Sequence, residues 1–499
     1  MAISTDAAAA ELGNTAVRSS SGGWKSARLI IFVEMAERFA YFGVSSNLIT
    51  YLTGPLGQPT AAAAANVNVW IGTMAFLPLL WAFVADGCLG RFRTIIISSS
   101  LYILGLGSLS FSAMIPSHSE DSDQLKVTLF FCSLFLIAIG QSGYKPCAKV
   151  FGADQFDSND LKERKAKSSY FNWLMFGSCI SITTTRLVST YIQENVSWSL
   201  GFGIQCVSML LALLLFLLGT TSYRFTVERE GKKNPFARIG RVFMEAIKNR
   251  REHNSDIANS NETLLLLAKQ SSEKFRFLDR AAISCELAEI EEAKSVLRLV
   301  PIWITCLVYA IVYAQSPTFF TKQGSKMDRS ISPGLLVPAA ALQCFINISV
   351  IVFIPVYDCL FVPITRSFTH IPSGITMLQR IGTGIFLSVI AMYVLYGVAD
   401  GFTMAGLQEF FYDQVPTELR SVGMAMNLSI YGAGNFLSSF MISVIDRATS
   451  QSGQTSWFDN DLNKAHLDYF YWLLASLSFI GLAFYMWFAK SYVYNRSNT

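Results

Sequence analysis

The chain has 499 residues, of which 52% are hydrophobic and only 15% are charged, and its mean hydropathy is +0.38. Soluble domains carry about 25% charged residues, so this composition excludes an ordinary soluble protein and predicts a membrane protein. The net charge of +4 is modest, and the basic residues fall in loops rather than forming a stripe. We therefore expect the lipid bilayer as a partner and no nucleic acid.

Six apolar segments fill the first half of the chain. The first 28 residues are rich in Ala and Ser and lack an apolar core, so we expect a disordered cytosolic N-terminus over 1–28 rather than a cleaved signal peptide. A bilayer core of about 30 Å requires roughly 20 apolar residues in each spanning helix. An N-terminal transmembrane bundle is therefore predicted over 29–222, with spans at about 29–53, 66–86, 94–115, 127–150, 169–192 and 199–222.

A polar stretch separates these spans from a second apolar set. Residues 223–295 carry basic runs such as "EREGKKNPFARIGR" and predict a cytosolic linker with some amphipathic helix. A C-terminal transmembrane bundle is predicted over 296–490, followed by a cytosolic tail over 491–499. Its apolar segments lie at about 296–318, 334–357, 375–412, 421–446 and 467–489.

The positions of Lys and Arg predict the orientation, because cytosolic loops carry an excess of both residues. Arg91 and Arg93 lie between the second and third spans, and the run "KERKAK" at 162–167 lies between the fourth and fifth. The third-to-fourth connection, "PSHSEDSDQLK", is acidic instead. We expect the basic loops and the N-terminus in the cytosol. The sequon Asn195-Val196-Ser197 then falls on the other side, where glycosylation is geometrically allowed but not established by a bare sequon.

Three charged residues interrupt the first span. Glu34, Glu37 and Arg38 share one face of a helix because they are three or four residues apart. A lone charge at a helix centre costs about 2.5–3.5 kcal/mol on insertion scales, so three on one face indicate mutual pairing or a water-lined cavity. Two carboxylates beside one guanidinium cannot both be fully compensated, so one should hold a proton more readily than an exposed acid. The cluster predicts a proton carrier; the alternative is an inert ion pair near a helix end.

Few other charges lie within the predicted spans. Lys145 and Asp400 are the clearest, one in each half and opposite in sign, which favours a bridge between the halves over two unrelated charges that snorkel to the surface. The loop "ADGCLGRFR" places Asp86, Arg91 and Arg93 directly after a span. Acidic and basic side chains at this position can clamp helix ends together at the cytosolic face.

The sequence lacks the residues that cofactor or enzyme chemistry requires. All four histidines fall in loops or at span edges, and none of the nine cysteines forms a CxxC pair. The absence of a GxxxxGK[ST] loop disfavours a nucleotide-driven pump, and the absence of a nucleophile motif disfavours an enzyme. We expect no cofactor and no metal, with the proton as the coupling ion.

The segment 375–412 is long enough for two spans but contains no connection between them. The stretch "FLSVIAMYVLYG" runs through its midpoint without a proline, a charge or a turn cluster. One continuous helix of this length would measure roughly 57 Å, nearly twice a bilayer core. Either a hairpin forms from residues that should span, or the rest of the chain inverts and carries the loop "YDQVPTELRS" across the membrane.

Four stretches of the chain resemble a known family in the order that the family has them. "EMAERFAYFG", "ADGCLGR", "GQSGYKPCAKVFGADQFD" and "GLQEFFYDQVP" are similar to motifs of the proton-dependent oligopeptide transporters, in the plant nitrate/peptide branch of the major facilitator superfamily. The resemblance implies an all-α membrane fold of two six-helix bundles around a central cavity, here with an abnormally short or fused ninth and tenth helix pair. It also implies substrate binding midway between the bundles.

The resemblance further implies roles at the matching positions. Glu34, Glu37 and Arg38 would couple the proton to the substrate. The substrate-binding residues would be Tyr41, Lys145, Tyr313 and Asp400, of which Lys145 and Asp400 would also form the bridge between the halves. The cytosolic gate would comprise Asp86, Arg91, Arg93 and Glu409.

The chain departs from the family pattern in three places. Met175 replaces an Asn of the oligopeptide members' fifth-helix signature, and Tyr313 stands where a nitrate-binding member carries a histidine. The connection between the ninth and tenth helices is missing. We expect a proton-coupled transporter of small nitrogenous solutes, nitrate before peptides or other small organic anions, in the plasma or vacuolar membrane. The alternative is a non-transporting sensor or an inactive isoform.

Overall fold

The structure is a computed structural model that carries side chains. It describes residues 22–84, 89–116, 120–156, 161–225, 235–249, 284–327, 329–332, 335–346, 360–369, 420–450, 456–461 and 465–492, together with isolated residues between 275 and 281 and between 348 and 415. The chain divides into two compact units. Unit 1 comprises Met1–Arg229, Ala314–Asn347 and Asn435–Leu467, and unit 2 comprises Glu230–Tyr313, Ile348–Gly434 and Asp468–Thr499.

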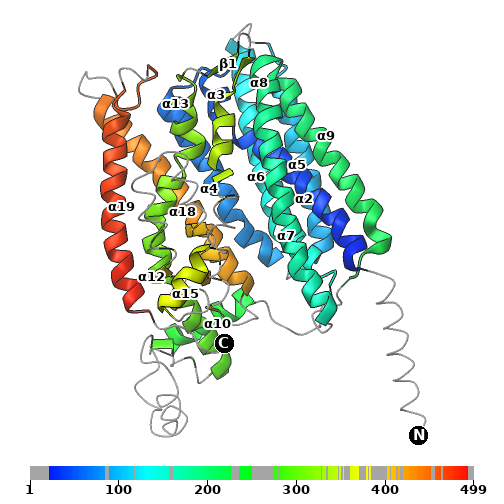
Figure 1. Cartoon of the computed structure of the whole chain (residues 1–499), viewed down its shortest axis with the longest axis vertical. Helices are drawn as coiled ribbons and strands as arrows, with labels where there is room; N and C mark the ends of the chain where they lie inside the picture. The colour runs from blue at the N-terminus through cyan, green and yellow to red at the C-terminus, as the bar shows by residue number, and fades with distance from the viewer. Residues whose placement is uncertain are drawn as a thin grey trace. The chain divides into compact units, whose positions relative to one another are not determined.

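The first half of the chain supplies the long helices of unit 1 (Figure 1). Each of the six segments expected there contains a helix or a broken helix, and most of these extend beyond the apolar stretch. In chain order they are α2 (Gly23–Ser45), α3 (Leu48–Thr53), α4 (Thr60–Val84), α5 (Arg91–Ser112), α6 (Glu120–Ala153), α7 (Leu161–Thr184), the π-helix η2 (Thr185–Ser189), α8 (Thr190–Asn195), α9 (Trp198–Leu218) and η3 (Gly219–Ser222).

Glycines allow α5 and α6 to pack at close range. A Cβ atom added at Gly140 would lie 2.5 Å from the backbone nitrogen of Tyr102, and one added at Gly105 would lie 2.8 Å from the backbone nitrogen of Ile137. Small residues of this kind let membrane helices approach until their backbones touch. The helix pair in turn supports α2, which packs against α6, α7 and α9.

Further short elements complete unit 1. They are η5 (Ser316–Phe320), α13 (Thr321–Gly324), β1 (Ser330–Ser332), β2 (Leu335–Leu336) and η6 (Ala339–Gln343). The two strands form a small antiparallel hairpin in which Ser330 pairs with Leu336. Apart from this hairpin, the described elements are helices, as the sequence predicts.

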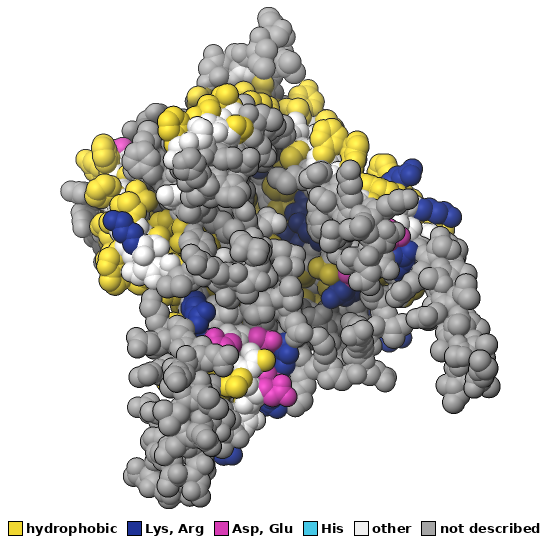
Figure 2. Space-filling view, turned by 60° about the horizontal axis from the view of Figure 1, so that its bottom comes forward, with side chains coloured by type: hydrophobic (Ala, Val, Ile, Leu, Met, Phe, Trp, Pro, Cys, Tyr) yellow, Lys and Arg dark blue, Asp and Glu magenta, His cyan; other side chains and the backbone are white. Residues whose placement is uncertain are grey.

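Unit 2 is built from α10 (Pro235–Lys248), α12 (Leu287–Tyr313), α15 (Val362–Thr369), the first half of α18 (Arg420–Ser450) and α19 (Leu467–Lys490). α12 begins at Leu287, inside the segment predicted as linker. Its polar first turns are helical because they pack against α10, with ion pairs of 3.2 Å from Arg238 to Glu292 and 2.5 Å from Arg241 to Glu289. Figure 2 shows charged side chains of both signs on the face seen from the α10 end.

α12 and α18 run in the same direction. Trp303 donates a hydrogen bond to Ser429 at 2.9 Å, and further along both helices Ala310 contacts Gly434. α18 therefore begins at the same end as α12. A hairpin within 375–412 predicts this direction, whereas the inversion predicts the opposite one. The segment itself, including Met392, lies outside the described residues apart from a few isolated positions.

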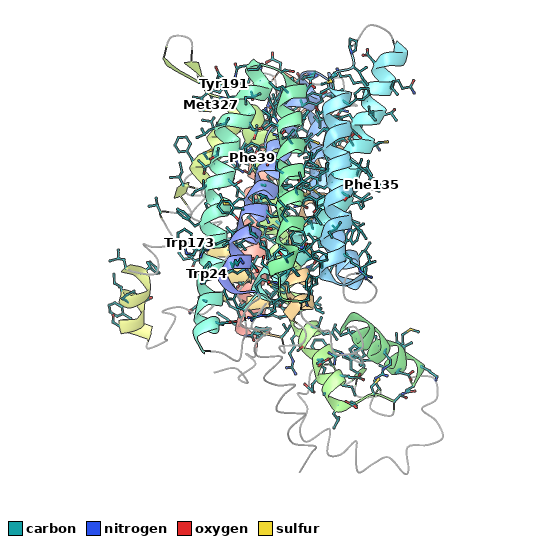
Figure 3. All side chains as sticks on the ribbon, turned by 90° about the vertical axis from the view of Figure 1, so that its right-hand side faces the viewer. Trp24, Phe39, Phe135, Trp173, Tyr191 and Met327 are labelled. Carbon is teal, nitrogen blue, oxygen red and sulfur yellow. The ribbon has the colours of Figure 1, made fainter. Side chains whose placement is uncertain are left out.

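The described helices have the lengths and surfaces of membrane spans. Seven of them are long and apolar enough to cross a bilayer. Figure 3 places Trp24 and Trp173 near one end of unit 1, and Tyr191 and Met327 near the other. Phe39 and the exposed Phe135 lie between these ends. Phe39 and its neighbours on α2 therefore lie between the two ends of the unit.

Candidate functional site

The charged cluster of α2 is buried in the middle of the helix. The exposed fractions of Glu34, Glu37 and Arg38 are 1%, 0% and 7%. Arg38 Nη2 lies 2.9 Å from Glu34 Oε1, and Arg38 Nε lies 3.4 Å from Glu37 Oε2. The cluster lies in the middle of α2 (Gly23–Ser45) and adjoins Phe39, which Figure 3 places between the two ends of unit 1. This placement disfavours an ion pair near a helix end.

α6 contributes the second side of the site. Gln141 Nε2 donates a hydrogen bond of 3.1 Å to Glu37 Oε1. One turn further along, Lys145 Nζ lies 5.9 Å from the centroid of the Tyr41 ring, within the range of a cation–π contact. The ring of Tyr41 stacks on Trp70 of α4 at 6.2 Å. The structure therefore brings together five of the predicted residues, Glu34, Glu37, Arg38, Tyr41 and Lys145.

Each carboxylate has one oxygen that accepts no hydrogen bond from the described residues. These atoms are Glu34 Oε2 and Glu37 Oε2, and both are buried. Arg38 is an ion-pair partner of both carboxylates, so its single charge is divided between two acids. The arrangement therefore keeps two acids and one cation together in the middle of α2.

Sequence reasoning missed two residues of this site, Gln141 and Lys149. Lys149 interacts electrostatically with both Glu34 and Arg38. Both residues belong to the fourth-helix motif "GQSGYKPCAKVFGADQFD", which also contains Lys145. The available signal was their spacing, because Gln141, Lys145 and Lys149 follow one another every four residues and so share one face of α6.

The predicted cytosolic gate is described only in part. Arg91 Nη1 lies 2.5 Å from Asp154 Oδ2, which ties the start of α5 to the end of α6. Arg93 is exposed. Asp86, Asp400 and Glu409 lie outside the described residues. Asp154 was missed by sequence reasoning, although it belongs to the quoted "GADQFD" stretch.

Tyr313, the remaining predicted substrate residue, belongs to unit 2. Its ring contacts Tyr431 of α18 with a centroid distance of 5.2 Å and an interplanar angle of 65°. Tyr309, one turn earlier on α12, lies 6.5 Å from the same ring. Tyr313 is therefore part of an aromatic group formed by α12 and α18.

A second polar network of unit 1, next to Tyr41 and Phe42, was not predicted. Arg186, in the π-helix η2, is 7% exposed and donates a hydrogen bond of 2.8 Å to the carbonyl of Gln343. Its guanidinium also lies 5.1 Å from the centroid of the Phe42 ring. In the same unit, Asn68 and Gln315 both donate to the hydroxyl of Ser438, at 3.0 Å and 2.9 Å. These bonds hold the segments 314–347 and 435–467 against the N-terminal helices.

The described residues contain no group of His, Cys, Asp and Glu that could hold a metal ion. Comparison with known proteins identifies the family. The family model of the POT family, PTR2, matches residues 92–398. Protein NRT1/PTR FAMILY 5.11 of Arabidopsis thaliana is 73% identical over 538 aligned positions that cover all of both chains. The chain belongs to the POT family.

A second relative supports this membership, and two solved structures share the fold. Protein NRT1/PTR FAMILY 5.12 of Arabidopsis thaliana is 58% identical over 532 positions, covering 97% of this chain and 95% of the relative. The fold is similar to the crystal structure of an auto-inhibited POT family peptide transporter, with a TM-score of 0.73, 21% identity and coverage of 95% and 99%. For the POT family transporter PepTSo, the TM-score is 0.71, with 20% identity and coverage of 94% and 98%.

As a POT family member, the chain is a multi-pass membrane transporter and not an enzyme. The chain also has fewer residues than its alignment with one relative has positions. The alignment with NRT1/PTR FAMILY 5.11 spans 538 positions, whereas this chain has 499 residues, so at least 39 aligned positions have no residue here.

Proposed function

We propose that this POT family member is a proton-coupled secondary active transporter of small nitrogenous solutes, with nitrate as the first candidate and di- or tripeptides or other small organic anions as further candidates. The observation that supports the proposal is the buried cluster of Glu34, Glu37 and Arg38 in the middle of α2. Buried ionisable groups in a membrane are expensive, and they mark ion and proton pathways.

The residues divide between proton coupling, substrate binding and gating. Glu34 and Glu37 would exchange the proton, while Arg38 holds whichever carboxylate is ionised. The substrate-binding residues would be Tyr41, Lys145, Tyr313 and Asp400. The gating residues would be Asp86, Arg91, Arg93 and Glu409. A bridge from Lys145 to Asp400 would open and close as access to the substrate site alternates between the two sides.

The charge of the substrate determines how much driving force is available. One pH unit supplies about 1.4 kcal/mol per proton, and 100 mV supplies about 2.3 kcal/mol per charge moved. A monovalent anion that moves with one proton carries no net charge and keeps only the pH contribution. Uptake of an anion into a negative interior therefore favours two protons, and Glu34 and Glu37 provide two carboxylates for them. Release of an anion into a more positive compartment does not need the second proton. Uptake would take place at the plasma membrane and release at the vacuolar membrane, so both are candidate locations.

Glutamine substitutions test the coupling. Glu34→Gln and Glu37→Gln keep the size of each side chain but remove its ability to carry a proton. We expect acid-driven nitrate uptake in oocytes to fall to the level of uninjected cells, with surface expression measured in parallel. The exposed lysine variant Lys25→Gln is the matched control and should keep normal uptake. Uptake that survives both glutamine substitutions would contradict the proposed coupling.

The shortened chain favours a second candidate, a non-transporting regulatory protein or an inactive isoform. Its support is the 39 aligned positions that this chain lacks. Under this alternative, the unmodified chain gives no uptake, and inserting a relative's connection between Met392 and Tyr393 restores it. Uptake by the unmodified chain would reject this candidate.

A further inference from the structure

The buried site carries more positive than negative charge. Arg38, Lys145 and Lys149 supply three cations, whereas Glu34 and Glu37 supply two carboxylates. The carboxylates are already engaged, because Arg38 pairs with both. Full ionisation of these five groups therefore leaves an excess of one positive charge within the membrane.

The excess is located on α6. Within the described part of the chain, neither Lys145 nor Lys149 forms an ion pair or a hydrogen bond. Both interact electrostatically with Glu34 and Glu37, and the ammonium of Lys145 lies over the Tyr41 ring. Both lysines are half-buried. A cation at this depth is costly unless a negative group lies beside it.

Helix geometry directs the two lysines to the same place. Gln141 fixes the face of α6 that meets α2, because it donates to Glu37. Lys145 and Lys149 follow at steps of four residues on that face. Their side chains are therefore neighbours, roughly 5–6 Å apart at the Cβ atoms. Two adjacent ammonium groups on one helix face can share a single anion.

From this arrangement we propose that Lys149, together with Lys145, binds the anionic group of the substrate, and that Lys149 selects a small monovalent anion over a zwitterionic peptide. The inference rests on the proposed function, since it concerns the substrate of the same site. A zwitterion brings no net charge and leaves the excess uncompensated. If Asp400 pairs with Lys145, the positive charge of Lys149 remains available to the substrate.

The same charges couple the anion to the proton. Protonation of Glu34 or Glu37 removes one negative charge and raises the excess from one to two, so the anion binds more tightly when the proton is present. By linkage, the bound anion strengthens proton binding by the same factor. Among the described residues, Tyr102 on α5, Tyr144 on α6 and Tyr170 on α7 also interact electrostatically with the carboxylates, and Arg186 on η2 interacts with Tyr41. Tyrosine ordinarily ionises near pH 10, and arginine stays charged, so neither changes the count at acidic or neutral pH.

Binding of anions to the purified full chain tests the inference. The probes are nitrate, chloride and the dipeptide Ala-Ala, each measured at acidic and at neutral pH for the unmodified chain, Lys149→Gln, Lys149→Arg and the control Lys25→Gln. Nitrate should bind more tightly at acidic pH. Lys149→Gln should raise its Kd about tenfold, a loss of about 1.4 kcal/mol, while Lys149→Arg and Lys25→Gln should stay close to the unmodified chain. In vesicles, Lys149→Gln should raise KM more than it lowers kcat.

The possible outcomes separate this inference from the proposed function. If nitrate does not bind but chloride binds in a manner that depends on Lys149, the anion site stands and nitrate is the wrong substrate. If Ala-Ala alone binds, the inference is overturned while proton-coupled transport is untouched. A nitrate Kd within twofold of normal in Lys149→Gln also overturns it. If Lys149→Gln misfolds, Lys149→Arg tests the inference instead. Loss of nitrate binding in a well-folded Lys149→Arg chain would contradict a role of Lys149 based on its charge.

Discussion

At the scale of single residues, Arg38 is the side chain on which the buried cluster depends, because it is an ion-pair partner of both Glu34 and Glu37. Replacing it by leucine leaves two buried carboxylates without their cation. We expect Arg38→Leu to lower the free energy of unfolding by about 3–5 kcal/mol at neutral pH, the usual cost of removing one partner of a buried ion pair. The loss should be smaller at acidic pH, where protonation neutralises the stranded carboxylates.

Unfolding of the purified chain by SDS, followed at both pH values, measures this effect. The triple variant Glu34→Gln, Glu37→Gln, Arg38→Leu removes all three charges and should recover most of the lost stability. If Arg38→Leu is equally destabilised at acidic and neutral pH, the loss comes from packing rather than from unpaired charge.

The sequence predicted the acids of this cluster but not their partners on α6. Glu34, Glu37 and Arg38 lie within one helical turn, so their spacing alone places them on one face. The partnership of Gln141 with Glu37 depends on the register between α2 and α6, which no spacing within a single helix encodes. Arg186 was missed for the same reason, since its partner Gln343 is distant in the sequence.

At the scale of elements, the contact between α5 and α6 depends on glycine. A Cβ atom at Gly140 would meet backbone atoms of Tyr102 and Ser98 at 2.5 and 2.7 Å, and backbone cannot move aside as a flexible side chain can. Gly140→Ala should therefore push the two helices apart and cost about 1–3 kcal/mol, the range for overpacked cores. The measurement is the midpoint of thermal unfolding in detergent.

Gly107 provides the matched control for this substitution. It lies on α5, but a Cβ atom there would meet Cys206 Sγ at 3.7 Å, an ordinary contact distance. Gly107→Ala should leave the unfolding midpoint nearly unchanged. Equal effects of the two substitutions would show that helix propensity, rather than close approach, determines the result.

Hydropathy located the spans but not their ends or their breaks. α12 starts at Leu287 because Glu289 and Glu292 pair with arginines of α10, a tertiary contact that a hydropathy profile does not register. A hydropathy profile does not reveal the π-helix η2 either. Its residue Arg186 donates a hydrogen bond to Ser46, which is distant in the sequence.

At the scale of the whole molecule, counting apolar segments does not give the direction in which each helix runs. The sequence allowed either a hairpin within 375–412 or an inversion of everything after it. Trp303 beside Ser429, and Ala310 beside Gly434, show that α12 and α18 run in parallel, which an inverted chain would not permit. The family membership was predictable because four motifs occur in order, whereas the 39 missing positions became countable only by alignment.

The parallel arrangement predicts the sidedness of the two loops that flank α18. Since α12 begins at the end of the linker, residues 413–419 should lie in the cytosol. Residues 451–466 should lie on the opposite side, where Asn460 accepts hydrogen bonds from Thr60. A glycosylation tag inserted in 451–466 should therefore be modified in the secretory pathway, and one inserted in 413–419 should not. An Asn195→Gln background removes the sequon between α8 and α9, and the mobility of each tagged chain is read against that parent. Modification of the 413–419 tag would mean an even number of crossings between α12 and α18, and their parallel packing could not then exist in the membrane.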